Sequence, residues 1–459
     1  MPKKYCLATL VLFASGVSVA EAEQKDNPAA ATANLGVSAP AAATAAGSPA
    51  PVKKARVKKA TASASASAPA AASTLSAASS PAAATSMAAP APSAGKVGTD
   101  RVVIPATPAL APEQSMFKFG GFGTLGVSHS SLNQGDYVVD SSMPKGVGRS
   151  NEWSIRNNTR VTAHAIANFT PQVSAMFQVD SEYRSDGSYR PEVEWLNVKY
   201  AFTPNIYMRV GRVPLPSFMD SENRDVGHSY VWVNPPVDVY RQLSIPSADG
   251  IDAVYRSEIG EAGNTVKAIY GTNTEKSSDS VSTSRDMWGI FDTFEYGFAT
   301  FHVSYQQRRS SSQSLATGVS GAWSNYSDLS VGASYDPGNW FIISEWVQHR
   351  SSTKVDAMYF SGGYRLDKFT PYFLYSQNSA GSFLTDSPSL AAIDRANRSQ
   401  STTGMGLRWD FMRNYDFKIQ YDLVKLSDNS NGYLINVPTG VTLYGSRFHV
   451  ISAVVDFVF

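Results

Sequence analysis

Hydrophobic and polar residues alternate in short segments from Ser115 to the end of the chain. In residues 156–169, RNNTRVTAHAIANF, the apolar side chains share one parity and most polar ones share the other. Residues 172–184, 326–336 and 415–425 repeat this split. A period of two is that of a β-strand with one apolar and one polar face. The pattern predicts an all-β protein with many strands, each about 8 to 14 residues long.

Short and long connections separate these segments in alternation. The short ones contain Pro, Gly, Asn or Asp, which favour chain reversal. The seven short connections are ANFTPQ, AFTPNI, IGEAGN, EYGF, YDPGNW, LDKF and FMRNY. The longer ones include residues 132–150, 214–248, 309–323, 379–397 and 428–445. Seven short turns at one end and eight connections at the other predict sixteen antiparallel strands.

A sheet of this size needs a cover for its apolar face, and the sequence offers no helices for that purpose. A closed barrel in lipid removes the difficulty, because every backbone group is paired, the apolar face meets hydrocarbon and the polar face surrounds water. Aromatic residues that suit the membrane interfaces are Phe169, Tyr200, Phe202, Tyr335, Trp340, Trp409 and Phe411. We therefore predict a transmembrane antiparallel β-barrel of about 16 strands over residues 113–459. The net charge of this region, −5, slightly favours cations.

The chain ends on an alternating segment, VISAVVDFVF. We expect this segment to be the sixteenth strand, which pairs with the first strand and closes the barrel. The residues expected to face lipid are Ile451, Ala453, Val455, Phe457 and Phe459. An exposed terminal aromatic residue is suited to a membrane interface.

The N-terminal part of the chain has a different composition. Residues 1–22 are typical of a secretory signal peptide, with Lys3 and Lys4 before an apolar stretch and a small-x-small site at its end. We expect cleavage after Ala22, with Ala20 as the alternative. Residues 23–112 are mostly Ala, Pro, Ser and Thr, which predicts a disordered periplasmic linker.

One basic patch interrupts the linker. Its five cations are Lys53, Lys54, Arg56, Lys58 and Lys59. Two interpretations stay open: a patch that only aids solubility, or contact with an anionic polymer such as the cell wall or lipid headgroups. Nucleic acid also fits the charge, but an exported chain does not meet it.

Other residue types exclude several kinds of chemistry. The single cysteine, Cys6, lies in the signal peptide, so we expect no disulfide, thiolate metal site or cysteine nucleophile in the mature chain. The six histidines lack metal-ligand spacing, and we expect neither a metal nor another cofactor. Gly121, Gly123 and Gly126 spell GxGxxG, but no helix follows, which favours close packing within a strand. No sequence signal favours a Ser-His-Asp triad, so an enzyme is not expected.

Three features resemble the proteobacterial outer-membrane porins: residues 117–131 (FKFGGFGTLGVSHSS), residues 189–218 (YRPEVEWLNVKYAFTPNIYMRVGRVPLPSF) and the terminal Phe459. The resemblance covers the whole barrel region. It implies a sixteen-stranded channel in the outer membrane of a Gram-negative bacterium, often a homotrimer. It also implies that the barrel-assembly machinery reads Phe459, and that the loop after the fifth strand folds into the pore. One departure is that residues 216–242 replace the acidic PEFGG-type signature of general diffusion porins.

The connection at residues 214–248 is the longest in the barrel, and its prolines and aromatic residues favour an ordered loop that folds inwards. A disordered outer loop is the alternative. The residues expected on the inner wall are Arg156 and Arg160 on the second strand, Asp180 on the third, Lys199 on the fourth and Arg209 on the fifth. Some of the loop acids Asp220, Glu222, Asp225 and Asp238 are expected opposite Arg156, Arg160 and Arg209. Arg224 and Arg241 would either pair with these acids or bind an anionic group of a solute. Opposed charged walls would create a transverse field that orients dipolar solutes and filters ions.

The function that this pattern favours is a passive channel for small hydrophilic solutes and ions. The alternative is a structural or interaction barrel with a blocked lumen, whose loops or basic patch bind a partner. The sequence does not distinguish which solute would pass.

Overall fold

A computed structural model describes residues 115–242, 245–277, 279–383 and 397–459. The predicted signal peptide, linker and basic patch lie outside the described residues. Within the described part of the chain, no helix is long and apolar enough to cross a membrane.

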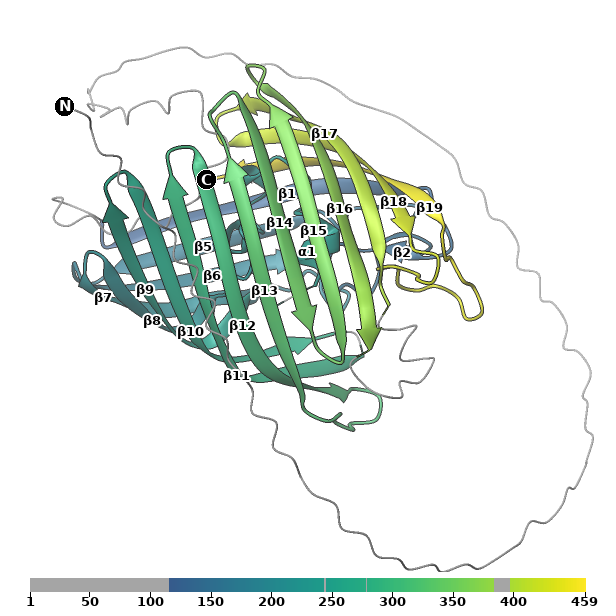
Figure 1. Ribbon diagram of the computed structural model, residues 1–459, viewed down its shortest axis with the longest axis horizontal. Coiled ribbons are helices and arrows are strands. Elements are labelled where there is room, and N and C mark those ends of the chain that lie inside the picture. Colours follow the sequence, from purple (N-terminus) through teal and green to yellow (C-terminus); the bar gives the residue numbers. More distant parts are fainter. Residues whose placement is uncertain (1–114, 243–244, 278, 384–396) are drawn as a thin grey trace, which may run out of the picture. The chain divides into compact units, whose positions relative to one another are not determined.

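Sixteen strands form one closed antiparallel barrel (Figure 1). In chain order they are β1 (Phe117–Ser130), β5 (Arg160–Asn168), β6 (Val173–Glu182), β7 (Glu192–Thr203), β8 (Ile206–Pro214), β9 (Ser247–Ile259), β10 (Ala262–Lys276), β11 (Ser280–Tyr296), β12 (Ala299–Ser314), β13 (Ser324–Tyr335), β14 (Trp340–Arg350), β15 (Thr353–Tyr364), β16 (Phe369–Phe383), β17 (Gln400–Met412), β18 (Tyr415–Leu426) and β19 (Arg447–Val458). Each strand pairs with the next, and β1 pairs with both β5 and β19. The predicted fold class and strand number are confirmed.

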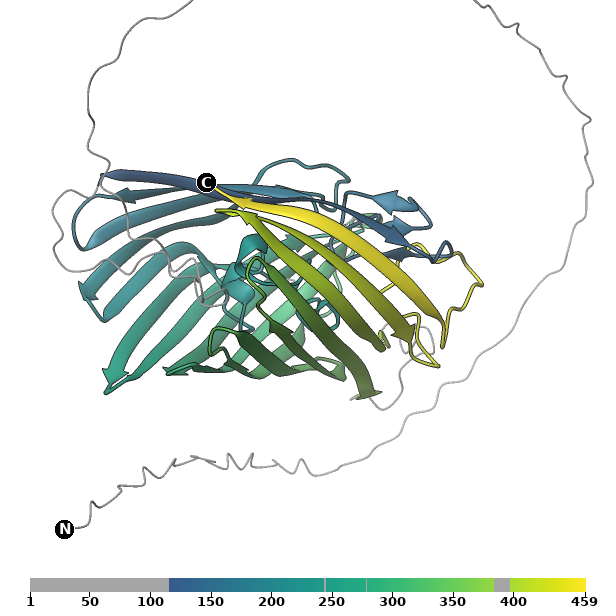
Figure 2. The same ribbon diagram turned by 90° about the horizontal axis from the view of Figure 1, so that it is seen from above.

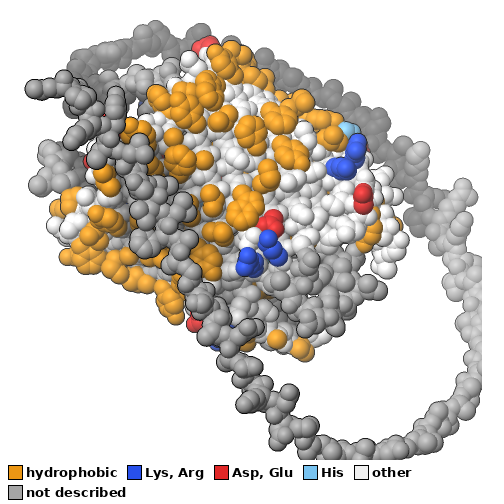
Figure 3. Space-filling model, in the orientation of Figure 1, with side chains coloured by type: hydrophobic (Ala, Val, Ile, Leu, Met, Phe, Trp, Pro, Cys, Tyr) orange, Lys and Arg blue, Asp and Glu red, His pale blue; other side chains and the backbone are white. Residues whose placement is uncertain are grey.

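The wall has the two faces that the alternation predicted. In β19, Ser452, Val454 and Asp456 are buried, whereas the five residues predicted to face lipid are exposed or half-buried. Hydrophobic side chains cover much of the outer face in Figure 3, and charged side chains are few there. The inner face therefore carries the polar side chains and surrounds the lumen.

The last strand closes the barrel, as predicted. The backbone N–H of Phe459 donates to the carbonyl of Gly121 at 2.9 Å, and the N–H of Gly121 donates back at 3.0 Å. Gly123 leaves room for an aromatic ring, since a Cβ there would lie 2.5 Å from Cζ of Phe457. The GxGxxG glycines thus lie in β1 and allow close packing, which confirms the strand interpretation.

The seven short turns fall where the sequence predicted them, but three of the longer connections have different limits. The first runs from Ser131 to Thr159 and contains β2 (Asp136–Tyr137), β3 (Val147–Gly148) and β4 (Trp153–Ser154). The prediction of a loop over 309–323 was wrong in its first part, because β12 continues to Ser314. Serine pairs, such as Ser284 with Ser310 at 2.7 Å, extend this β11–β12 ladder. Similarly, β16 continues to Phe383, beyond the predicted start of its loop at 379.

The connection between β8 and β9, here named the inner loop (residues 215–246), lies inside the barrel. It contains η1 (Ser221–Asn223), η2 (Gly227–Ser229) and α1 (Val237–Tyr240). Figure 2 shows α1 between the barrel walls. Phe218, Trp232 and Val239 of the loop are almost fully buried in a cluster that includes inward-facing residues of β14 to β16. The expectation of an ordered, inward-folded loop is confirmed for the residues described.

Candidate constriction in the lumen

Inward-facing polar side chains of β14 to β17 hold one side of the inner loop. The indole N–H of Trp232 donates to the Ser361 hydroxyl at 2.8 Å. The backbone N–H of Met219 donates to the Glu345 carboxylate at 3.0 Å. The Asp238 carboxylate accepts hydrogen bonds from Ser376 and Gln400, both at 2.6 Å. Each of these hydrogen bonds holds a backbone or side-chain group of the inner loop against the barrel wall.

Two buried cations on β17 and β18 hold the middle of the loop. The Lys418 ammonium donates to the carbonyls of Gly227 at 2.6 Å and Trp232 at 3.0 Å. Arg408 donates to the carbonyls of His228 and Tyr230 at 2.8 and 3.0 Å. Buried charge is costly unless it is paired and hydrogen-bonded. The pairing is provided by carboxylates of the same wall: Asp456 for Lys418 at 3.0 Å and Asp416 for Arg408 at 3.2 Å.

The loop also reaches the opposite wall. The Arg160 guanidinium, at the start of β5, donates to Asp225 at 3.4 Å and to the Tyr230 hydroxyl at 2.7 Å. Glu222 forms an ion pair with Lys267 of β10 at 2.5 Å. The inner loop therefore crosses the lumen and is tied to strands on both sides.

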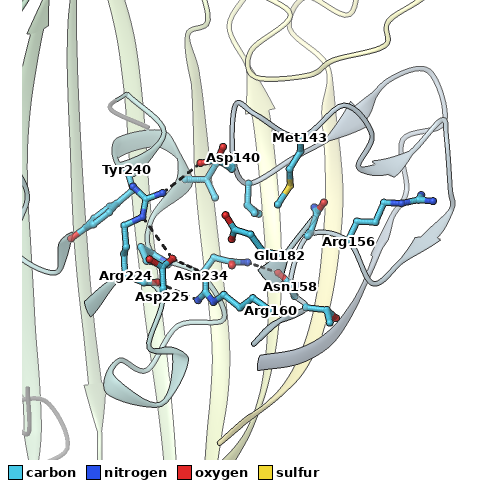
Figure 4. Close-up of a pocket in the computed structure, with 15 residues that line it drawn as sticks. Asp140, Met143, Arg156, Asn158, Arg160, Glu182, Arg224, Asp225, Asn234 and Tyr240 are labelled. Carbon is cyan, nitrogen blue, oxygen red and sulfur yellow. Dashed lines mark hydrogen bonds and ion pairs between the residues drawn. The ribbon is translucent and has the colours of Figure 1, made fainter. Parts of the chain in front are cut away.

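A charged cavity lies between the loop and β5 (Figure 4). It holds about 620 Å³ of empty space, part of it open to solvent. Its charged lining consists of Arg156, Arg160, Arg224, Asp140, Glu182 and Asp225. Figure 4 shows Asp225 close to both Arg224 and Arg160, whereas Arg156 is directed away from them.

The arginines decide the ionisation of Asp225. Burial of this carboxyl group alone would raise its pKa. The nearby Arg224 and Arg160 guanidiniums outweigh the burial and hold the pKa of Asp225 below its usual value. Asp225 is therefore a fixed negative charge beside two fixed positive charges.

Some of the residues predicted on the basic wall do not face the loop acids. Arg209 forms its ion pair with Asp252 of the neighbouring strand β9, and the loop acid Glu222, which binds Lys267, lies nearby. Arg156 precedes β5, instead of lying on the second strand as predicted, and its guanidinium lies 5.1 Å from the ring centre of Tyr183. Asp180 binds Arg184 at 2.6 Å, and Lys199 lies next to Tyr207.

The loop residues are likewise divided between different parts of the lumen. Asp238 faces β16 and β17, whereas Asp225 is the loop acid that lies beside Arg160. The Arg241 guanidinium donates to the carbonyls of Val138 at 3.0 Å and Tyr433 at 2.8 Å, which lie outside the inner loop. It thereby ties the inner loop to the β1–β5 and β18–β19 connections. The backbone N–H of Asp220 donates to the Tyr240 hydroxyl at 3.0 Å.

Sequence reasoning missed several residues that hold the loop. They are Lys267, Glu345, Arg408 and Lys418. The available signal was their inward parity on strands whose other face is apolar. That signal assigns a side chain to the lumen but does not identify its partner on the loop. Among the described residues, no group of three or more His, Asp or Glu side chains is arranged to hold a metal ion.

Comparison with known proteins identifies the fold. No family model and no curated protein matches the sequence. The outer membrane channel DcaP of Acinetobacter baumannii aligns with a TM-score of 0.50 at 12% identity, over 76% of this chain and 100% of that chain. The anion-selective porin from Comamonas acidovorans gives 0.46 at 12% identity, over 75% and 100%. OmpF of Salmonella typhi, solved with daunomycin, gives 0.47 at 13% identity, over 75% and 97%.

These neighbours are outer-membrane β-barrel proteins of Gram-negative bacteria. The chain has a Gram-negative outer-membrane porin-like fold. The resemblance found in the sequence is confirmed at the level of the fold.

Proposed function

We propose that this protein is an outer-membrane porin, a water-filled channel for passive diffusion of small hydrophilic solutes and ions. The observation that supports it best is the inner loop, which crosses a polar lumen and places Asp225 beside Arg160 at 3.4 Å. Such a loop narrows a barrel of sixteen strands, and adjacent opposite charges create a field across the gap that remains. The function needs neither a cofactor nor a catalytic residue.

The proposal includes the cellular setting. An N-terminal signal peptide would direct export, and Phe459 would be read by the barrel-assembly machinery. The barrel would sit in outer-membrane lipid as a homotrimer. The basic patch at residues 53–59 would either aid solubility or contact an anionic polymer such as the cell wall.

A second candidate is a barrel with a blocked lumen that binds a partner through its loops. The observation in its favour is that two other connections pack together at the same end of the barrel. An antiparallel β-bridge between Asp136 and Ile435 joins the β1–β5 and β18–β19 connections. Arg241 of the inner loop donates a hydrogen bond to a backbone carbonyl in each of these two connections. This arrangement would restrict entry to the lumen.

Recording from the purified protein in a planar bilayer distinguishes the two. A porin gives open, ohmic current steps, and a blocked barrel gives none. Swelling of protein-loaded liposomes in sugars, amino acids and organic acids then identifies the class of solute that passes.

A further inference from the structure

Three cations surround one tyrosine ring on the inner wall. The Lys199 ammonium lies 5.1 Å from the ring centre of Tyr207, and the guanidinium carbons of Arg256 and Arg209 lie at 5.7 and 5.9 Å. The four residues come from the adjacent strands β7, β8 and β9. A tyrosine face attracts cations, but a single ring offsets only a small part of their mutual repulsion.

The charges in this cluster do not balance. Arg209 is neutralised by the buried carboxylate of Asp252. Within the described ranges, neither Lys199 nor Arg256 forms an ion pair with a carboxylate. Glu222, also in this part of the lumen, is bound to Lys267. Two positive charges are therefore available for a ligand.

The cluster lines a cavity of its own. The cavity holds about 470 Å³ of empty space, partly open, and Ser174 and Asn197 add polar side chains to its lining. It lies towards the short-turn end of the barrel, since the backbone N–H of Arg256 donates to Asn205 in the β7–β8 turn at 2.9 Å. None of the inner-loop residues lines it. The cavity is thus separate from the one that Asp225 lines.

We infer that Lys199 and Arg256, which line one cavity beside the ring of Tyr207, form a binding site for a small oxyanion, either a carboxylate or a phosphate. An oxyanion accepts charge-assisted hydrogen bonds from an ammonium and a guanidinium at once, and the planar guanidinium favours two oxygens of one group. Low-dielectric walls strengthen the attraction within the lumen. The site gives a barrel of net negative charge a local preference for anionic solutes. The inference deepens the proposed function and rests on it for the route by which the anion enters.

The test is isothermal titration calorimetry of the purified full-length protein in detergent, with sodium phosphate and sodium succinate in separate titrations against a sodium chloride background. Binding of either oxyanion is expected, and the one that binds more tightly identifies the ligand class. The double variant Lys199→Gln, Arg256→Gln should weaken this binding by about tenfold or more, because it removes two charge-assisted hydrogen bonds. The matched control is Arg190→Gln, an exposed arginine outside the cluster, which should bind as the unaltered protein does.

The inference is overturned if neither oxyanion gives a heat of binding. It is also overturned if the double variant binds the oxyanion as tightly as the unaltered protein does. Circular dichroism and heat-modifiable migration of the double variant confirm that the barrel is folded. Planar-bilayer recording on the same samples separates this inference from the proposed function. A protein that conducts without binding oxyanions refutes only the site, and one that binds oxyanions without conducting refutes only the channel.

Discussion

At the scale of single residues, the inner loop is held by buried cations of the wall. Lys418 is fully buried and binds two loop carbonyls as well as Asp456. Its Nζ also lies 4.7 Å from the ring centre of Tyr230. Lys418 therefore fixes the loop and neutralises a carboxylate at the same time.

Lys418→Met is expected to destabilise the barrel by about 3 to 5 kcal/mol, because it leaves the buried carboxylate of Asp456 without its cation. The urea midpoint of the purified protein in detergent measures this loss. Lys425→Met, at an exposed position of the same strand, is the control and should leave the midpoint unchanged. Equal midpoints for the two variants would show that Lys418 does not hold the loop.

Asp225→Asn tests the electrostatics beside Arg160 and Arg224. Removal of the negative charge takes away the ion-pair partner of Arg160 and leaves Arg224 with Asp140 alone, so the anion-to-cation permeability ratio should rise. Two unit charges 4 Å apart in water interact by about 1 kcal/mol, which corresponds to about a fivefold change in that ratio. The reversal potential in a potassium chloride gradient measures it. Asp186→Asn, at an exposed position between β6 and β7, is the control, and no difference between the two variants would contradict a field at Asp225.

At the scale of elements, strand number and facing were predictable from the sequence because a period of two is a local property. The seven short turns were predictable for the same reason, since Pro, Gly, Asn and Asp mark them. The register in which neighbouring strands pair was not predictable in this way, because it joins residues far apart in the chain. Arg209 and Asp252 are 43 residues apart in the chain and become neighbours only when β8 and β9 pair.

The contacts of the inner loop were still less accessible to sequence reasoning. Parity assigned Arg160 and Lys418 to the lumen, but their loop partners depend on how the closed barrel surrounds residues 215–246. The pairing of Arg160 with Asp225 followed from opposite charge on facing elements. The position of Asp238 could not be predicted from charge, because its partners Ser376 and Gln400 are uncharged.

The last strand carries a prediction of its own. Deletion of Phe459 removes a backbone pair with Gly121 and one of the aromatic rings that lie over the β1 glycines. The amount of folded, heat-modifiable barrel in the outer membrane should therefore fall. Phe459→Tyr keeps both the backbone pair and the ring and should fold normally. A full yield of folded barrel without Phe459 would show that closure does not need it.

At the scale of the whole molecule, all sixteen barrel strands lie between Phe117 and Val458. Deletion of residues 23–112, with the signal peptide kept, is therefore expected to leave folding and conductance unchanged. Heat-modifiable migration and bilayer recording measure the two properties. Loss of folding would place part of the barrel's folding information in the deleted segment. Loss of cell-wall association alone would support a binding role for the basic patch at 53–59.

The proposed channel requires an inner loop that narrows a conducting lumen. The most direct measurement is single-channel recording of the purified protein beside a variant whose loop is shortened between Phe218 and Tyr230. That segment contains Glu222 and Asp225, which tie the loop to β10 and β5. The unaltered protein should give ohmic steps, and the variant should give larger conductance with weaker ion selectivity. Absence of steps from the unaltered protein, or identical conductance and selectivity in both, would contradict this proposal.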